Sequence, residues 1–81
     1  MLIRRDKMSE QIINEIKKLA NIATDMDLSS NIRIDAVKSI GAIGTRESLL
    51  ALLDLVANEN INNDERELAL KQAQKIVRAA R

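Results

Sequence analysis

Two segments of the chain resemble each other at a separation of 33 residues. Each begins with an apolar stretch, continues through a polar turn and ends in an amphipathic stretch. The matched pairs are Leu19 and Leu52, Ile22 and Leu55, Ala23 and Val56, Leu28 and Ile61, Arg33 and Arg66, Ala36 and Ala69, and Lys38 and Lys71. A period of this length is typical of stacked helical repeats, in which each hairpin buries its apolar side against the next. The repeat therefore predicts an all-α fold of four antiparallel helices, and it does not by itself predict a chemistry.

The length of 81 residues predicts a single helical domain over residues 1–81. Hydrophobic residues make up 46% of the chain and none is aromatic, so the core must be built from Leu, Ile, Val, Ala and Met. No apolar run approaches the roughly 18–20 residues of a membrane span. No apolar segment with a small-residue cleavage site follows the basic residues of Met1–Lys7, so we do not expect a secretory signal. Because the chain has no cysteine, we expect a cytoplasmic protein without disulfides or thiolate metal sites.

Positive and negative charges nearly balance over the whole chain. There are 13 basic and 12 acidic residues, a formal net charge of +1, so the total does not require a strongly charged partner. The distribution is uneven, because residues 1–24 and 65–81 are net positive and residues 25–64 are net negative. Ordinary solvated helix faces account for this pattern, and a charged binding surface is the alternative.

Apolar residues at three- and four-residue spacing predict a first helix from about Ser9 to Thr24. Ser9 is the expected N-cap, which leaves residues 1–7 as a loosely ordered N-terminal extension. The expected apolar stripe consists of Ile12, Ile13, Ile16, Leu19, Ala20, Ala23 and Met26.

The second helix is expected to follow an N-cap at Ser29 and to end at about Ile43, with Gly44 as a left-handed C-cap. Gly41 lies inside the helical pattern, where a glycine usually allows a neighbouring helix to approach closely. The predicted buried residues of this helix are Ile32, Ala36, Val37, Ile40 and Ile43.

Two further helices are expected in the second half of the chain. Thr45 is the predicted N-cap of a third helix that is apolar on nearly all sides, so it is either central and buried or in contact with a partner. A polar turn then leads to Asn62, which with Glu65 three residues later predicts a capping box for the fourth helix. That helix is expected to continue to the C-terminus.

The second predicted helix and its end carry a recognisable motif. It consists of Arg33, Ala36, Ile40, Gly41, Ile43 and Gly44. On these residues the stretch 32–44 resembles the second-helix motif of HEAT-like repeats, most closely the phycobilin-lyase-type subtype that also occurs in many prokaryotic scaffold proteins. The resemblance covers residues 19–77 and implies about two stacked HEAT-like helix hairpins.

The second copy of the repeat departs from this motif, because Ala73 and Gln74 replace the isoleucine and glycine. Such a departure is expected for a capping repeat with no following neighbour. Residues 8–10 and 30–33 also resemble a family of short, uncharacterised archaeal helical proteins, which would imply a stand-alone protein with no assigned activity. Neither resemblance implies catalytic, cofactor-binding or metal-binding residues.

The chain lacks the residue types on which most catalytic and metal sites depend. It has neither histidine nor cysteine, and no phosphate-binding glycine loop or nucleophile elbow surrounds its serines and threonines. Two acidic pairs, Asp25 with Asp27 and Asp64 with Glu65, are near enough in sequence to share a cation, but capping or solvating the turns is the simpler interpretation. We therefore predict no enzyme, no cofactor, no metal site and no small-molecule substrate.

A short stack of helical repeats leaves apolar surface uncovered at its ends. We therefore predict a non-enzymatic protein–protein interaction or scaffolding module, which binds a protein partner or forms a homo-oligomer, and no membrane association. The uncovered surface is expected beside Leu2, Ile3 and Met8, or at the end of the last helix.

The alternative is a weak nucleic-acid-binding helical-repeat protein that uses a basic N-terminal arm and the last helix. The basic residues of these two segments are Arg4, Arg5, Lys7, Lys71, Lys75, Arg78 and Arg81. The nearly neutral net charge and the absence of aromatic residues for base stacking count against this alternative.

Arg33 and Arg66 occupy the same position in the two repeats. We predict a structural role for both, in which each guanidinium reaches a turn carbonyl or an acidic neighbour such as Asp27. A row of ligand-contacting arginines is the alternative.

Overall fold

Four α-helices joined by short turns make up the fold of the described residues. The structure is a computed structural model that describes residues 3–80, with side chains from residue 10 onward. No strand occurs within residues 3–80, and the predicted all-α fold class is confirmed. The helices are α1 (Ile3–Ala23), α2 (Ser30–Ile43), α3 (Arg46–Ala57) and α4 (Asn63–Ala79).

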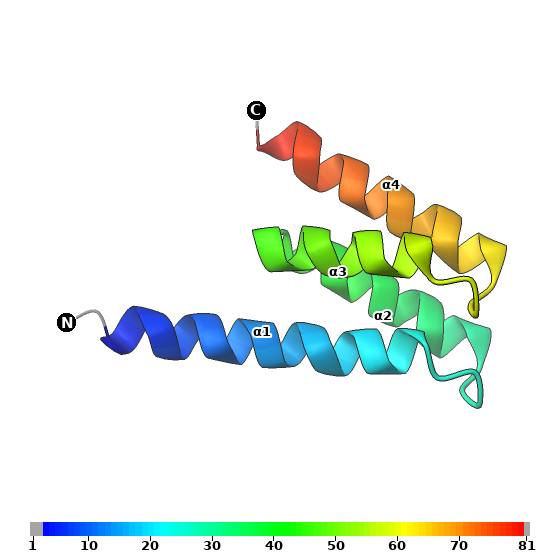
Figure 1. The fold of residues 1–81 in the computed structure, drawn as a ribbon, viewed down its shortest axis with the longest axis horizontal. Helices are drawn as coiled ribbons and strands as arrows, with labels where there is room; N and C mark the ends of the chain where they lie inside the picture. Colours follow the sequence, from blue (N-terminus) through cyan, green and yellow to red (C-terminus); the bar gives the residue numbers. More distant parts are fainter. Residues whose placement is uncertain (1–2, 81) are drawn as a thin grey trace.

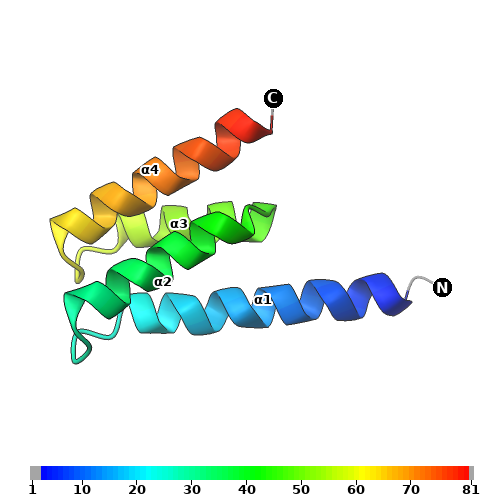
Figure 2. The ribbon, with the colours of Figure 1, turned by 180° about the vertical axis from the view of Figure 1, so that it is seen from behind.

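The helices form two antiparallel hairpins, α1–α2 and α3–α4, that pack on each other. Across the junction, α3 packs on α1 and α4 packs on α2, with further contacts between α2 and α3. α2 lies behind α3 in Figure 1 and in front of it in Figure 2, so the first helices of the hairpins form one layer and the second helices another. The N-terminal part of α1 extends past the other helices in both views.

The turns within the two hairpins contain the same kind of hydrogen bond, from a backbone N–H to the side-chain oxygen of the residue two positions earlier. The Oδ1 atom of Asp25 accepts a hydrogen bond from the backbone N–H of Asp27 at 3.0 Å, and the Oδ1 atom of Asn58 accepts one from the backbone N–H of Asn60 at 2.8 Å. These residues are 33 positions apart, as are the first residues of α2 and α4. The two hairpins are therefore structural counterparts around their turns, and the resemblance to HEAT-like repeats remains a prediction.

α1 begins earlier than the sequence predicts. The helix starts at Ile3, so Ser9 lies inside it and is not an N-cap. The predicted loosely ordered extension is thus wrong for residues 3–7, which are helical, whereas Met1 and Leu2 lie outside the described residues. The physical reason is that residues 3–8 include no glycine or proline and are mostly good helix formers, so nothing stops the helix before Ser9.

Local capping residues set the other predicted helix ends. The Oγ atom of Ser29 accepts a hydrogen bond from the backbone N–H of Ile32 at 3.4 Å. Thr45 and Ser48 form a reciprocal capping box, with backbone-to-hydroxyl distances of 3.2 and 3.3 Å. Gly44 has a φ angle of 70°, which confirms the predicted left-handed C-cap of α2.

Replacing Gly44 with alanine should lower the free energy of unfolding by about 1–2 kcal/mol. The loss is conformational, because a Cβ atom at Gly44 would come no closer than 3.9 Å to its neighbours. Urea denaturation followed by circular dichroism measures it. Gly44→Asn is the matched control and should lose less, since asparagine adopts the left-handed region more readily. Equal losses in the two variants would contradict this account.

Gly41 lies where α2 approaches α4. A Cβ atom at this position would be 2.8 Å from the Cδ atom of Gln72 and 3.0 Å from its Cβ atom. Both distances are shorter than ordinary carbon–carbon contacts. The glycine therefore lets the second helices of the two hairpins pack closely, as predicted.

The core is aliphatic and extends across both hairpins. Burial of Val37 and Ile40 is confirmed, since neither side chain is exposed. Two predicted apolar contacts are wrong: Ile32 is 48% exposed, because α2 turns the neighbouring Arg33 inward, and Met26 is 47% exposed in the turn after α1. The core cluster consists of Ala23, Ala36, Val37, Ile40, Leu52, Leu55, Ile61, Ala69 and Ala73.

Candidate functional site

A buried ion pair joins the two hairpins. The Nε atom of Arg33 on α2 donates to the Oε1 atom of Glu65 on α4 at 2.8 Å, and the two side chains are 6% and 1% exposed. Arg33 also donates to the backbone carbonyl of Leu28 in the first turn. The predicted contact with a turn carbonyl is thus confirmed. The acidic partner is Glu65 of the following hairpin and not Asp27, the example that the sequence suggested.

The same contact explains why the predicted capping box of α4 is wrong. Asn62 is the N-cap residue, but its side chain makes no capping hydrogen bond. The Glu65 side chain instead turns into the core, where the Arg33 guanidinium attracts it. Its Oε2 atom is the one fully buried side-chain oxygen or nitrogen without a hydrogen-bond partner among the described residues.

Arg66 repeats the position of Arg33 without the acidic partner. Its Nε atom donates to the backbone carbonyl of Val56 in the last turn of α3 at 2.9 Å, a contact that the predicted structural role would produce. Within the described residues the one ion pair is that between Arg33 and Glu65, so Arg66 has no carboxylate within 4.0 Å. Arg66 is partly exposed and lies beside Leu70 at the open end of the stack.

An apolar surface covers the open side of the second hairpin. We call it the α3–α4 face and define it as Leu49, Leu50, Leu53, Leu70, Ile76 and Val77. Four of these side chains are strongly exposed: Leu50 by 53%, Val77 by 46%, Leu53 by 43% and Leu70 by 41%. An open cavity of about 540 Å³ and an adjoining one of about 300 Å³ lie on this face, and both are lined mainly by aliphatic side chains.

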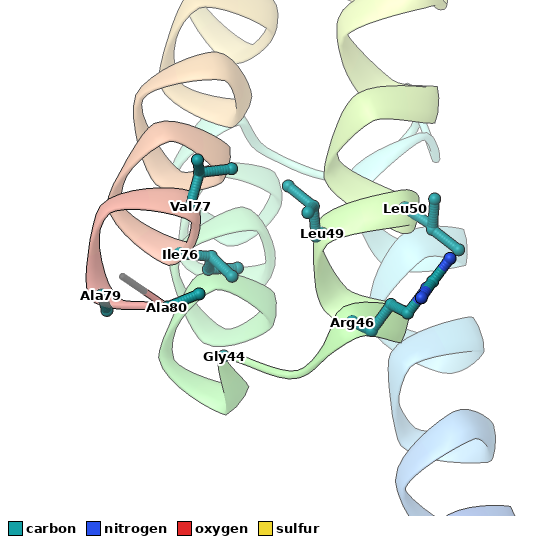
Figure 3. Close-up of a pocket in the computed structure, with 8 residues that line it drawn as sticks. All are labelled: Gly44, Arg46, Leu49, Leu50, Ile76, Val77, Ala79 and Ala80. Carbon is teal, nitrogen blue, oxygen red and sulfur yellow. The ribbon is translucent and has the colours of Figure 1, made fainter.

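Figure 3 shows how the larger cavity is built. Leu49 of α3 and Ile76 and Val77 of α4 point into the space between the two helices. Leu50 and Arg46 project from the other flank of α3, and the chain at Gly44 lies at one end of the space. The cavity therefore opens between α3 and α4 and extends to the flank of α3 that carries Arg46 and Leu50.

The open surface of α3 corresponds, 33 residues earlier, to a surface of α1 that is covered inside the stack. Ile16 and Ala20 of α1 line a small cavity that α1 shares with α3. The residues 33 positions later are Leu49 and Leu53, which lie on the α3–α4 face. The surface of α3 that is open thus corresponds to the surface of α1 that α3 covers.

The second helices, α2 and α4, show the same correspondence between a covered and an open surface. Gly41 of α2 faces Gln72 of α4, and its counterpart Gln74 lines the α3–α4 cavity. Val37 is completely buried, whereas its counterpart Leu70 is 41% exposed. The difference arises because a following hairpin packs on α2, while none packs on α4 within the described chain.

The opposite end of the stack is polar. The second hairpin faces the first through Ala51, Asn58, Glu65 and Gln72. The counterparts of these residues on the outer side of the first hairpin are Lys18, Asp25, Ile32 and Ser39. All four are exposed and only one is apolar. The two ends of the stack therefore differ in chemistry.

The structure places only part of the predicted basic segments. Lys71, Lys75 and Arg78 are exposed on α4. Arg81 and the side chains of Arg4, Arg5 and Lys7 lie outside the described residues, as do the side chains of Leu2, Ile3 and Met8. The described part therefore supports a basic row on one helix and leaves the predicted basic arm and N-terminal apolar contact untested.

The acidic pairs are turn and helix-start residues. Asp25 accepts a backbone hydrogen bond in its turn, and Asp64 is exposed in the first turn of α4. In the part of the chain that the structure describes, no three metal-ligating side chains gather at one place. None of the described helices combines the length and apolar character that a membrane span requires.

No family model, curated protein or solved structure matches the chain. The α3–α4 face is thus the feature from which a function can be proposed. The sequence indicated that the third helix is apolar on nearly all sides, but not which residues are exposed. The repeat carries that signal for α4, because Leu70 falls on Val37, which is buried in the core that the two hairpins share.

Proposed function

We propose that the protein is a non-enzymatic protein–protein interaction or scaffolding module and that the α3–α4 face is its binding surface. The observation that carries the proposal is the grouping of Leu50, Leu53, Leu70 and Val77, which are 41–53% exposed and line two adjoining cavities. Contiguous exposed apolar patches on a soluble fold mark interaction sites. Four of the six strongly exposed large apolar residues among the described ones belong to this patch.

The chemistry of the face favours a protein partner over a small ligand. Small-molecule sites combine an apolar wall with a few convergent polar groups. Here the polar lining residues do not converge on one point, because Arg46 projects from the other flank of α3, away from the space between α3 and α4, whereas Gln74 and Arg78 line the adjoining cavity. A groove between two helices with leucines three residues apart suits the apolar side of a partner helix. The expected partner therefore presents helical apolar surface.

Affinity capture from cells that produce the protein tests the proposal. We expect proteins retained by the wild-type chain to be lost with a Leu50→Glu/Val77→Glu variant, because the contact would bury two unpaired carboxylates. The matched control is Lys18→Glu/Ser39→Glu, which alters the polar end of the stack and should retain the same proteins. Circular dichroism checks that both variants remain helical. Retention that is equal for all three chains would contradict the proposal.

A second candidate function, weak nucleic-acid binding, is supported by one observation. Lys71, Lys75 and Arg78 are exposed on α4 at spacings of four and three residues, so they project from one side of the helix. The same capture experiment separates the two functions. Nucleic acid that is retained at low salt and released steeply by added salt would support this candidate, whereas loss of retained proteins in Leu50→Glu/Val77→Glu supports the first.

A further inference from the structure

We propose that the α3–α4 face binds the same face of a second copy of the chain, so that two chains form a closed dimer about a two-fold axis. This inference rests on the proposed function, because it takes the α3–α4 face to be an interaction surface, and it adds the identity of the partner. Three properties of the molecule support it: the shape of the face, the polarity of the opposite end and the charges beside the face.

The shape of the face suits a helical hairpin of this same kind. The corresponding surface of the first hairpin already holds α3–α4, and there Ile16 and Val37 are 4% and 0% exposed. Their counterparts on the α3–α4 face are Leu49, which is partly buried, and Leu70, which is 41% exposed. The α3–α4 hairpin of a second copy offers the same layout of two helices with leucine side chains directed outward.

A head-to-tail continuation of the stack is unfavourable. It would place the outer side of α1–α2 of the second copy on the α3–α4 face, and that side presents Lys18 and Asp25. Charged groups that are buried without partners oppose binding. The contact equivalent to Arg33–Glu65 would also set Arg66 against Ile32, which has no carboxylate. The α3–α4 face of the second copy avoids both problems.

Charges at the two ends of the exposed stripe on α4 favour antiparallel docking. The stripe consists of Leu70, Gln74 and Val77, with Glu67 before it and Arg78 after it, and all five are exposed. If Leu70 packs against Val77 of the second copy, Glu67 lies within two residues, about 3 Å along the axis, of the position opposite Arg78 of that copy. Their long side chains span that offset. Parallel docking would instead place Glu67 beside Glu67 and Arg78 beside Arg78 of the second copy, so that like charges meet.

Two-fold docking closes the assembly at two chains. Each copy uses its α3–α4 face and directs the polar side of α1–α2 outward, so among the described residues no equivalent surface is left for a third copy. The expected species in solution is therefore a dimer and not a filament.

Sedimentation equilibrium on the full chain tests the dimer. We expect a monomer–dimer equilibrium in the micromolar range, and Leu50→Glu/Val77→Glu should raise the dissociation constant roughly 100-fold. Lys18→Glu/Ser39→Glu is the matched control and should leave it unchanged. Circular dichroism verifies the helix content of each variant.

Charge reversal at two exposed positions tests the antiparallel arrangement, and circular dichroism checks that each variant remains helical. Glu67→Arg and Arg78→Glu should each raise the dissociation constant roughly tenfold, because each creates two like-charge contacts per dimer. The double variant Glu67→Arg/Arg78→Glu should recover the wild-type value. An equimolar mixture of the two single variants should form heterodimers, since both contacts then join opposite charges.

The outcomes separate this inference from the proposed function. A strict monomer at high micromolar concentration, or a dimer that Leu50→Glu/Val77→Glu leaves intact, would overturn the inference. If the monomer still captures proteins through Leu50 and Val77, the proposed function stands, and only the identification of the partner as a second copy of the chain is wrong. If neither dimerisation nor capture depends on these residues, both proposals fail. Single charge reversals without effect would overturn the antiparallel docking.

Discussion

Replacing Arg33 with methionine is expected to lower the free energy of unfolding by about 3–5 kcal/mol. The variant leaves the Glu65 carboxylate, whose side chain is 1% exposed, without its counter-charge. It also removes the donor to the carbonyl of Leu28. Domains of this size have a total stability of only about 4–12 kcal/mol, so the loss would consume much of it. Urea denaturation followed by far-ultraviolet circular dichroism, at one fixed protein concentration, measures the change.

The repeat supplies the matched control for this prediction. Arg66 occupies the same repeat position, but it is partly exposed and donates only to the carbonyl of Val56. Arg66→Met should therefore lose about 1 kcal/mol. The double variant Arg33→Met/Glu65→Leu removes both buried charges and should recover most of the lost stability. A loss in Arg33→Met no larger than that in Arg66→Met would contradict the importance of the buried pair.

Replacing Leu52 with alanine is expected to lower the free energy of unfolding by about 2–5 kcal/mol. Leu52 is completely buried in the aliphatic core, so truncation leaves a cavity that the surrounding helices fill only in part. The neighbouring Leu53 is 43% exposed on the α3–α4 face, and Leu53→Ala should lose less than about 1 kcal/mol in the monomer. The comparison is made by urea denaturation at concentrations where the chain is monomeric, because dimerisation stabilises the folded state. Similar losses in the two variants would contradict the assignment of the buried side of α3.

The features that were predictable from the sequence depend on neighbours within one helical turn. The caps at Ser29, Gly44 and Thr45 use hydrogen bonds or a backbone angle set by residues at most three positions away. The capping box at Asn62 is also a local pattern, yet it does not form, because Glu65 binds Arg33, which is 32 positions away in sequence. A local rule cannot include a competitor that only the tertiary fold brings near.

Side-chain burial on α2 likewise depends on tertiary contacts that a local sequence pattern does not contain. Apolar periodicity assigns Ile32 to the core, but the structure exposes it and buries the adjacent Arg33. An arginine side chain is buried at low cost only where hydrogen-bond acceptors surround its guanidinium. For Arg33 these acceptors are the carbonyl of Leu28 in the first turn and the carboxylate of Glu65 on α4. The candidate site was predictable in kind, as an uncovered end of a repeat stack. Its residues followed only once the packing showed which sides of α3 and α4 are open.

The Arg33–Glu65 contact also gives the stack a direction. An arginine of one hairpin reaches a carboxylate of the hairpin that follows, and Arg66 provides the next arginine in the series. A longer tandem array engineered from this chain is therefore expected to accept additional copies of the α3–α4 hairpin with its N-cap Thr45, because each copy brings its own glutamate to the preceding arginine. Appending residues 3–45 would place Ile32 at that position. Extension with the C-terminal hairpin therefore preserves the ion pair between hairpins, whereas extension with the N-terminal hairpin loses it.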